Sequence, residues 1–313
     1  MKTLLRYPFK TLNNRLLSPW TTLFRKDEGR DRPILDTHSV MTKLVEAKEP
    51  MLYGKIGTTE LMALEHSDRY FSLPWPSAMN FRRSARRLYI DSGLFPETRE
   101  QFDEFLRIYR ASIAELDCIC LWQDTAFLQA YEREVATQLC PHAGFIEPSS
   151  LSPLCILPHI SHLRWLVVSP FVQTMRQQAP RLRQIFGCFP WAVQIPEIGP
   201  RCEFVRCPFF PYMESSPYKN WSEGLDQLAG EILAKDFDLA IVGAGAWSLP
   251  LLARVKRSGK KGIHLGGSTQ LLFGIKGRRW DDYCSAYYND SWIRPLPEDT
   301  PQGCMQKENG CYW

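Results

Sequence analysis

The segment of the chain that most constrains its fold runs from Phe237 to Trp280. It holds two apolar stretches typical of buried strands, and each is followed by a glycine-rich turn and a helix-like stretch. Parallel α/β proteins bind phosphate-bearing ligands at such strand-to-helix turns, because backbone N–H groups at a helix start point toward the ligand. The pattern therefore predicts a parallel sheet with an anion site beside the two turns.

The rest of the chain repeats this alternation of strands and helices. Mainly parallel sheets with helices on both faces have this order of elements. The predicted fold class is therefore α/β, with a Rossmann-like, mainly parallel sheet in a single domain. The sequence predicts strands at 51–57, 117–122, 162–171 and 202–210, and helices at 35–49, 58–66, 98–113, 124–139, 171–187 and 220–235.

Composition divides the chain into three regions. Residues 1–34 form a basic amphipathic leader, 35–282 the α/β domain, and 283–313 an irregular tail that we expect to wrap over the domain and to fray after Pro301. Basic and apolar residues alternate within 1–32, which suits peripheral contact with an anionic membrane surface. A solvated, poorly ordered leader is the alternative.

Several function classes are disfavoured by composition. No run approaches the ~18 apolar residues that a membrane-spanning helix needs, and charged residues interrupt the N-terminus before a signal-peptide core can form. The ten cysteines form no CxxC pair and are typical of a reducing compartment. We expect a cytoplasmic protein, with peripheral contact at the inner face of the membrane as a variant of that placement. The near-neutral core lacks the basic stripe of a nucleic-acid binder.

The first glycine turn, Gly243-Ala244-Gly245, matches the opening of a dinucleotide fingerprint. Ser248 stands where the third glycine belongs, and the next strand ends at His264 instead of at an acidic residue for the ribose. These departures argue against NAD, FAD and S-adenosylmethionine. Two interpretations remain for this turn: an anion site, and a tight turn that needs small residues for packing.

The second turn, Gly266-Gly267, again places backbone donors at a predicted helix start. His264 would point from the strand end into the same crevice, as a site residue or as a satisfied structural histidine. Three cationic side chains follow closely, and arginine is well shaped to bind a diphosphate. These cations are Lys276, Arg278 and Arg279.

A third candidate site follows the predicted strand at 51–57, where Glu60 lies in the first turn of the next helix. A carboxylate there could coordinate a metal, hydrogen-bond a sugar, or simply favour the helix dipole. Elsewhere, three residues of the types that bind zinc lie close together in sequence and form a lower-ranked zinc candidate: Cys155, His159 and His162.

The stretch Lys55-Ile56-Gly57-Thr58-Thr59-Glu60 resembles the Arg-aromatic-Gly-Asp-Gly-Glu signature of the GT-D fold type of glycosyltransferases. Lys55 falls on the arginine, Gly57 on the first glycine and Glu60 on the glutamate. In that family the aspartate and glutamate help bind the metal–nucleotide, so the resemblance implies Mn²⁺ or Mg²⁺ at Glu60. Thr58 replaces the aspartate and puts that metal in question. The resemblance covers about residues 40–282.

The resemblance implies a glycosyltransferase that moves a sugar from a nucleotide-sugar donor to a cell-surface glycan or lipid-linked glycan precursor. The alternative is a non-catalytic nucleotide-sugar-binding or glycan-binding protein of a polysaccharide assembly complex, which the Thr58 replacement favours. In the enzyme reading, Glu60 or His264 acts as the base. The candidates for holding the donor diphosphate are Lys55, Gly57, Thr58, Gly243, Gly245, Gly266, Gly267, Lys276, Arg278 and Arg279.

Overall fold

The computed structural model describes residues 32–70 and 76–313. The predicted membrane contact through residues 1–32 therefore falls almost entirely outside the described residues. Within them, every helix is too short or too polar to cross a lipid bilayer.

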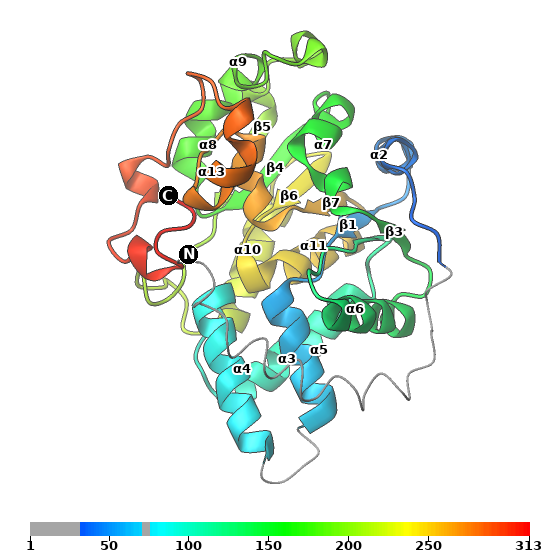
Figure 1. Cartoon of the computed structure of the whole chain (residues 1–313), viewed down its shortest axis with the longest axis vertical. Helices are drawn as coiled ribbons and strands as arrows, with labels where there is room; N and C mark the ends of the chain where they lie inside the picture. Colours follow the sequence, from blue (N-terminus) through cyan, green and yellow to red (C-terminus); the bar gives the residue numbers. More distant parts are fainter. Residues whose placement is uncertain (1–31, 71–75) are drawn as a thin grey trace, which may run out of the picture.

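Seven strands form one sheet in the order β3-β2-β1-β7-β6-β4-β5, and every pairing is parallel (Figure 1). Strands such as β4 read as continuous apolar runs because both faces of the sheet are covered. This confirms the predicted α/β class. The strands are β1 (Leu52–Gly54), β2 (Cys118–Cys120), β3 (Gly144–Ile146), β4 (Trp165–Ser169), β5 (Cys202–Arg206), β6 (Leu239–Val242) and β7 (Lys261–His264).

Helices cover both faces of the sheet, and each face has its own hydrophobic core. Alternate residues of β4 enter the two cores: Val168 packs into one and Val167 into the other. The first face carries α3 (Thr58–Tyr70), α4 (Pro76–Ser92), α5 (Arg99–Ile113), α6 (Ala126–Leu139), α10 (Trp221–Leu233) and α11 (Ser248–Arg257). The second carries α2 (Thr37–Glu46), α7 (Pro153–Ile160), α8 (Val172–Gln178), α9 (Leu182–Ile185) and α12 (Thr269–Leu272).

Local sequence signals explain where several helices begin and end. The side chains of Asp36, Thr98 and Asn220 accept hydrogen bonds from backbone N–H groups three residues on, and so cap α2, α5 and α10. The predicted break at Pro180 is confirmed, because a short 3₁₀ turn separates α8 from α9 there.

The direction of the crossovers fixes where a site can form. The chain runs from β1 through β2 to β3 toward one edge of the sheet, whereas β4 leads to β5 at the other edge. The loops after β1 and β4 therefore diverge, and the carboxyl ends of β7 and β6 lie between them. Open α/β sheets bind ligands in the crevice that such a divergence creates.

The tail departs from expectation. Its last residues do not fray: Cys311 is buried, and the Trp313 indole donates to the Asp299 carbonyl at 2.9 Å. The buried Asp299 carboxylate in turn accepts from the backbone and hydroxyl of Thr174 on α8. Long-range hydrogen bonds thus hold the end of the chain, where the sequence predicted fraying. The predicted tail, 283–313, begins in the last turn of α13 (Arg278–Cys284).

Candidate functional site

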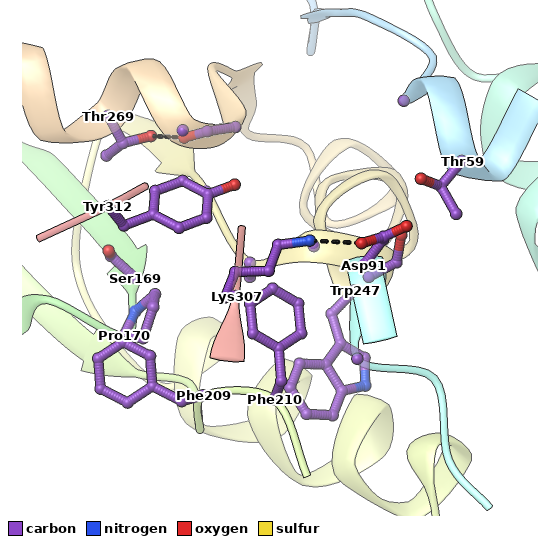
Figure 2. A pocket seen from close by; sticks show the side chains of 18 of the residues that line it. Thr59, Asp91, Ser169, Pro170, Phe209, Phe210, Trp247, Thr269, Lys307 and Tyr312 are labelled. Carbon is purple, nitrogen blue, oxygen red and sulfur yellow. Dashed lines mark hydrogen bonds and ion pairs between the residues drawn. The ribbon is translucent and has the colours of Figure 1, made fainter. Parts of the chain in front are cut away.

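A cavity of about 400 Å³ opens at the carboxyl edge of the sheet. The turns after β1, β4, β6 and β7, with Arg279 at the start of α13, form one wall, which we call the strand-end wall. The end of α4, the loop after β5 and the C-terminal tail supply most of the remaining lining, which we call the tail wall (Figure 2). Residues far apart in sequence thus meet at the position that the crossovers predict.

Most of the predicted site residues line this cavity, and two do not. Lys276 directs its ammonium to the Tyr288 ring, 5.2 Å from the ring centroid. Arg278 donates to the Asn309 carbonyl at 2.9 Å. Neither is among the residues that line the cavity, so of the predicted cationic cluster only Arg279 faces it. The other lining residues from the prediction are Lys55, Gly57, Thr58, Glu60, Gly243, Gly245, His264, Gly266 and Gly267.

Two half-buried cations line the strand-end wall. The Lys55 ammonium lies 3.4 Å from the centroid of the Trp122 ring, and burial lowers its pKa to about 8, so it remains charged at neutral pH. The Arg279 guanidinium lies 4.7 Å from the centroid of the Tyr312 ring. Neither cation forms an ion pair with any carboxylate in the described part of the chain. An anionic ligand would supply the missing charge partner.

Glu60 lies at the floor of the cavity and is only 6% exposed. Burial raises the pKa of its carboxyl, although a hydrogen bond from Ser92 opposes the shift. The carboxylate rests directly against the backbone of Gly57, and a Cβ at that position would overlap it. Any larger residue at Gly57 would therefore displace the Glu60 carboxylate from this position.

Behind this floor lies a buried polar network that the sequence did not predict. The Thr58 hydroxyl donates to the side-chain oxygen of Gln123 at 3.0 Å. Gln123 donates in turn to the Ile56 carbonyl and to Glu132, at 2.9 and 3.3 Å. Glu132 is completely buried, and this burial raises its pKa to about 7. The Thr58 hydroxyl thus already donates its proton to Gln123, so it can only accept a hydrogen bond from a ligand.

His264 ends β7 and is held in one tautomer. Its Nδ1 lies 3.0 Å from the Lys55 carbonyl, and because a carbonyl only accepts, Nδ1 carries the proton. Burial and the neighbouring Lys55 charge lower the pKa of the imidazole to about 3. The ring is therefore neutral at physiological pH, and its Nε2 can accept a hydrogen bond but cannot act as an acid.

The two glycine turns pack closely against each other, as expected if they need small residues for packing. A Cβ on Gly243 would overlap the Gly266 carbonyl, so close contact between the two turns requires a small residue. Gly266 itself has φ +57°, a left-handed conformation that favours glycine. Ser248, at the third-glycine position, accepts the Ala244 N–H at 2.9 Å and so consumes one donor of the first turn. Both turns nevertheless line the cavity.

The donor set does not fit a metal ion held by the protein. Hard divalent cations prefer several carboxylate or carbonyl oxygens, but the residue two positions before Glu60 is Thr58, whose hydroxyl already donates to Gln123. Across residues 32–70 and 76–313, no three His, Cys, Asp or Glu side chains gather at one point. The same finding removes support for the zinc candidate at Cys155, His159 and His162.

The tail wall supplies functional candidates that the sequence did not reveal. Lys307, whose side chain is 3% exposed, reaches across to α4, where its ammonium lies 2.6 Å from Asp91 Oδ1 (Figure 2). Phe210 lies beside this pair, with its ring centroid 5.1 Å from the ammonium. Trp247 and Tyr312 complete the apolar surround. No local pattern could have joined Asp91 to a residue 216 positions later.

Comparison with known proteins adds little. No protein-family model and no curated protein matches the sequence. Among solved structures, the chain is similar to the "Selenomethionine substituted structure of domain of unknown function 1792 (DUF1792)". The alignment covers 84% of this chain and 96% of that chain, at 11% identity and a TM-score of 0.34. A similarity this distant carries no conclusion about activity.

Proposed function

We propose that this protein is a glycosyltransferase that moves a sugar from a nucleotide-sugar donor to a glycan acceptor. The observation that carries the proposal is the pair of half-buried cations without carboxylate partners, Lys55 and Arg279, in the cavity at the carboxyl edge of the sheet. A diphosphate presents the charge that these cations lack, and arginine binds phosphate oxygens with two parallel hydrogen bonds. The motif around Glu60, which resembles that of GT-D enzymes, lines the same cavity.

The arrangement gives the protein's own residues defined roles in such a transfer. An acceptor hydroxyl oxygen attacks the anomeric carbon, the bond from that carbon to the diphosphate oxygen breaks, and the nucleoside diphosphate leaves. Lys55 and Arg279 offset the negative charge that develops on the leaving group. Glu60 takes the proton of the acceptor hydroxyl, since a raised pKa makes a carboxylate a stronger base. His264 keeps the Lys55 backbone in place through its Nδ1 hydrogen bond.

In this proposal Lys55 and Arg279 neutralise the diphosphate charge that a divalent ion would otherwise neutralise. The side chains that could bind such an ion are few, because Thr58 is hydrogen-bonded to Gln123 and Glu60 is the motif's remaining carboxylate. Transfer is therefore expected to proceed equally with and without Mn²⁺ or Mg²⁺.

The alternative is a non-catalytic nucleotide-sugar-binding or glycan-binding protein of an assembly complex. The Thr58 replacement favours it, because loss of one carboxylate from the motif is what a lapsed catalytic site would show. The two functions use the same binding site. They differ in whether Glu60 acts as a base.

Calorimetric titration with UDP- and GDP-sugars, together with an assay of donor hydrolysis, separates the two. The enzyme proposal expects binding by the wild type, slow release of nucleoside diphosphate, and a Glu60→Gln variant that still binds but no longer turns over. Binding without turnover in either protein would leave the binding function alone. Absence of binding to every nucleotide-sugar would overturn the enzyme proposal and leave glycan binding as the remaining alternative.

A further inference from the structure

The two ends of the cavity differ in charge. Lys55 and Arg279 make the strand-end side cationic. On the tail wall, the Lys307 ammonium lies 2.6 Å from Asp91 and 3.5 Å from Glu308, so two carboxylates surround one cation. That end therefore repels phosphate and suits a neutral group that can both donate and accept hydrogen bonds.

Neutral groups that donate and accept at once are hydroxyls. Asp91 uses Oδ1 for Lys307 and, among the described residues, has no hydrogen bond to Oδ2, while 27% of its side chain is exposed at the cavity. A sugar hydroxyl could donate to Asp91 and accept from Lys307, and such charge-assisted bonds are the stronger ones in proteins. Phe210 and Trp247 add apolar surface of the kind that packs against the C–H groups of a sugar ring.

Glu60 lines the same cavity. Its carboxylate is close enough to interact electrostatically with Lys55 and with Asp91 and Lys307. A substrate with its diphosphate at the cations and its ring at the tail wall would have the connecting anomeric carbon near this carboxylate. The charge pattern of the cavity thus imposes one orientation on a molecule that is anionic at one end and polyhydroxylated at the other.

We propose that Asp91 and Lys307 form the sugar-reading subsite, in which the pair hydrogen-bonds the hydroxyls of a pyranose ring and sets which sugar is accepted. The inference rests on the proposed function and deepens it. The ring can belong to the donor or to the acceptor, since the recognising chemistry is the same for both. The pair is distinct from the Lys55 motif, and it joins α4 to the C-terminal tail (Figure 2).

The test uses the full chain and the variant Asp91→Asn, which keeps the shape of the side chain and removes its charge. Affinities are measured for free UDP and GDP and for a panel of their sugars. We expect free nucleoside diphosphate to bind as in the wild type, and the preferred nucleotide-sugar to bind roughly tenfold or more weakly, as loss of a charge-assisted bond predicts. Discrimination between epimeric sugars should shrink.

A second readout distinguishes the source of the ring. If donor affinities are unchanged but the KM for a glycan acceptor rises without a change in kcat, the subsite holds the acceptor sugar. The matched control is Arg86→Gln, which breaks an exposed ion pair with Glu97 near the same end of α4 and should change no affinity. Lys307→Met is the second variant, and the unfolding midpoint of each protein reports whether it folds.

Two outcomes would overturn the inference while leaving the proposed function intact. One is an Asp91→Asn variant that discriminates sugars and uses acceptor as the wild type does. The other is equal weakening of free nucleoside diphosphate and nucleotide-sugar, which would assign the pair to phosphate binding or to folding. If the wild type binds no nucleoside diphosphate at all, the proposed function fails and this inference fails with it.

Discussion

The two sides of the cavity are built in different ways. On the strand-end wall, Lys55, Glu60 and His264 follow directly from buried strands and lie where the sheet places them. On the tail wall, Asp91 and Lys307 come from a helix end and from an irregular segment joined by a long-range ion pair. The first wall is therefore set by local sequence and sheet geometry, whereas the second exists only when distant segments have packed together.

The largest effect should come from removing the cations of the strand-end wall. Hydrogen bonds to charged groups contribute ~1.5–3 kcal/mol, so Lys55→Met and Arg279→Met should each weaken nucleoside diphosphate binding about 10- to 100-fold. Calorimetric titration with UDP or GDP measures this. Arg278→Met is the matched control, since Arg278 is a neighbouring cation that bonds to Asn309 outside the cavity. Equal losses in control and test variants would show that net charge, and not position, governs binding.

The next effect concerns the fit between Gly57 and Glu60. A Cβ at Gly57 would overlap the Glu60 carboxylate, so Gly57→Ala should destabilise the fold by about 1–3 kcal/mol, as overpacking does. Urea unfolding measures the change. Gly230→Ala on α10 is the control, because its Cβ would meet open space and should stabilise the helix by up to about 1 kcal/mol. If both variants gain stability, the carboxylate does not occupy the position described.

A third prediction tests the buried network behind the strand-end wall through pH. The folded-state pKa of Glu132 is raised to about 7 by burial, above its ordinary value of 4.5. A raised pKa means that the unfolded state releases its proton first, so wild-type stability falls as pH rises from about 4.5 through 7. Glu132→Gln removes this penalty. The variant should match the wild type near pH 4 and exceed it by about 1–3 kcal/mol at pH 8 in denaturant unfolding. A constant difference across this range would contradict the assignment.

The smallest effect should appear where the two walls touch. Tyr312 from the tail lies against the Arg279 guanidinium, whose central carbon is 4.7 Å from the centroid of the Tyr312 ring. Such a cation–π contact contributes about 0.5–2 kcal/mol, and Tyr312→Phe keeps the ring and removes only the hydroxyl, so the variant should weaken nucleoside diphosphate binding by less than about tenfold. Tyr288→Phe, which removes a hydroxyl bonded to Asp281, is the control and should leave binding unchanged. A loss as large as that of Arg279→Met would mean that the tail wall governs phosphate binding.

Sequence alone could predict the fold and the strand-end wall, for a physical reason. Apolar runs, caps such as Thr98 and glycine turns act locally, and a parallel sheet then carries strand ends to one edge. Lys276 shows the limit of that reasoning. Sequence proximity to Arg279 suggested a shared role, but the turn of the chain directs Lys276 to Tyr288 instead.

The tail wall could not be predicted because its signal is not periodic. Residues 301–313 are rich in polar residues and glycine, a composition typical of a loose end. Tertiary contacts hold them, such as the hydrogen bond from Trp313 to Asp299 and the ion pair of Lys307 with Asp91. The Glu132 network escaped prediction for a related reason, since a glutamate on an amphipathic helix is ordinarily assigned to its solvated face.

The position of β1 in the sheet has a consequence for synthesis of the chain. One side of β1 pairs with β2, but the other pairs with β7, and Leu52 lies opposite Gly262. At ~5–20 residues per second on the ribosome, β7 follows β1 by roughly ten to forty seconds. Through that interval the nascent amino-terminal half carries an open, apolar strand edge, which is the feature that chaperones shield and that aggregation exploits. The hydrogen bonds between β1 and β7, whose ends border the cavity, thus form only when nearly the whole chain has been made.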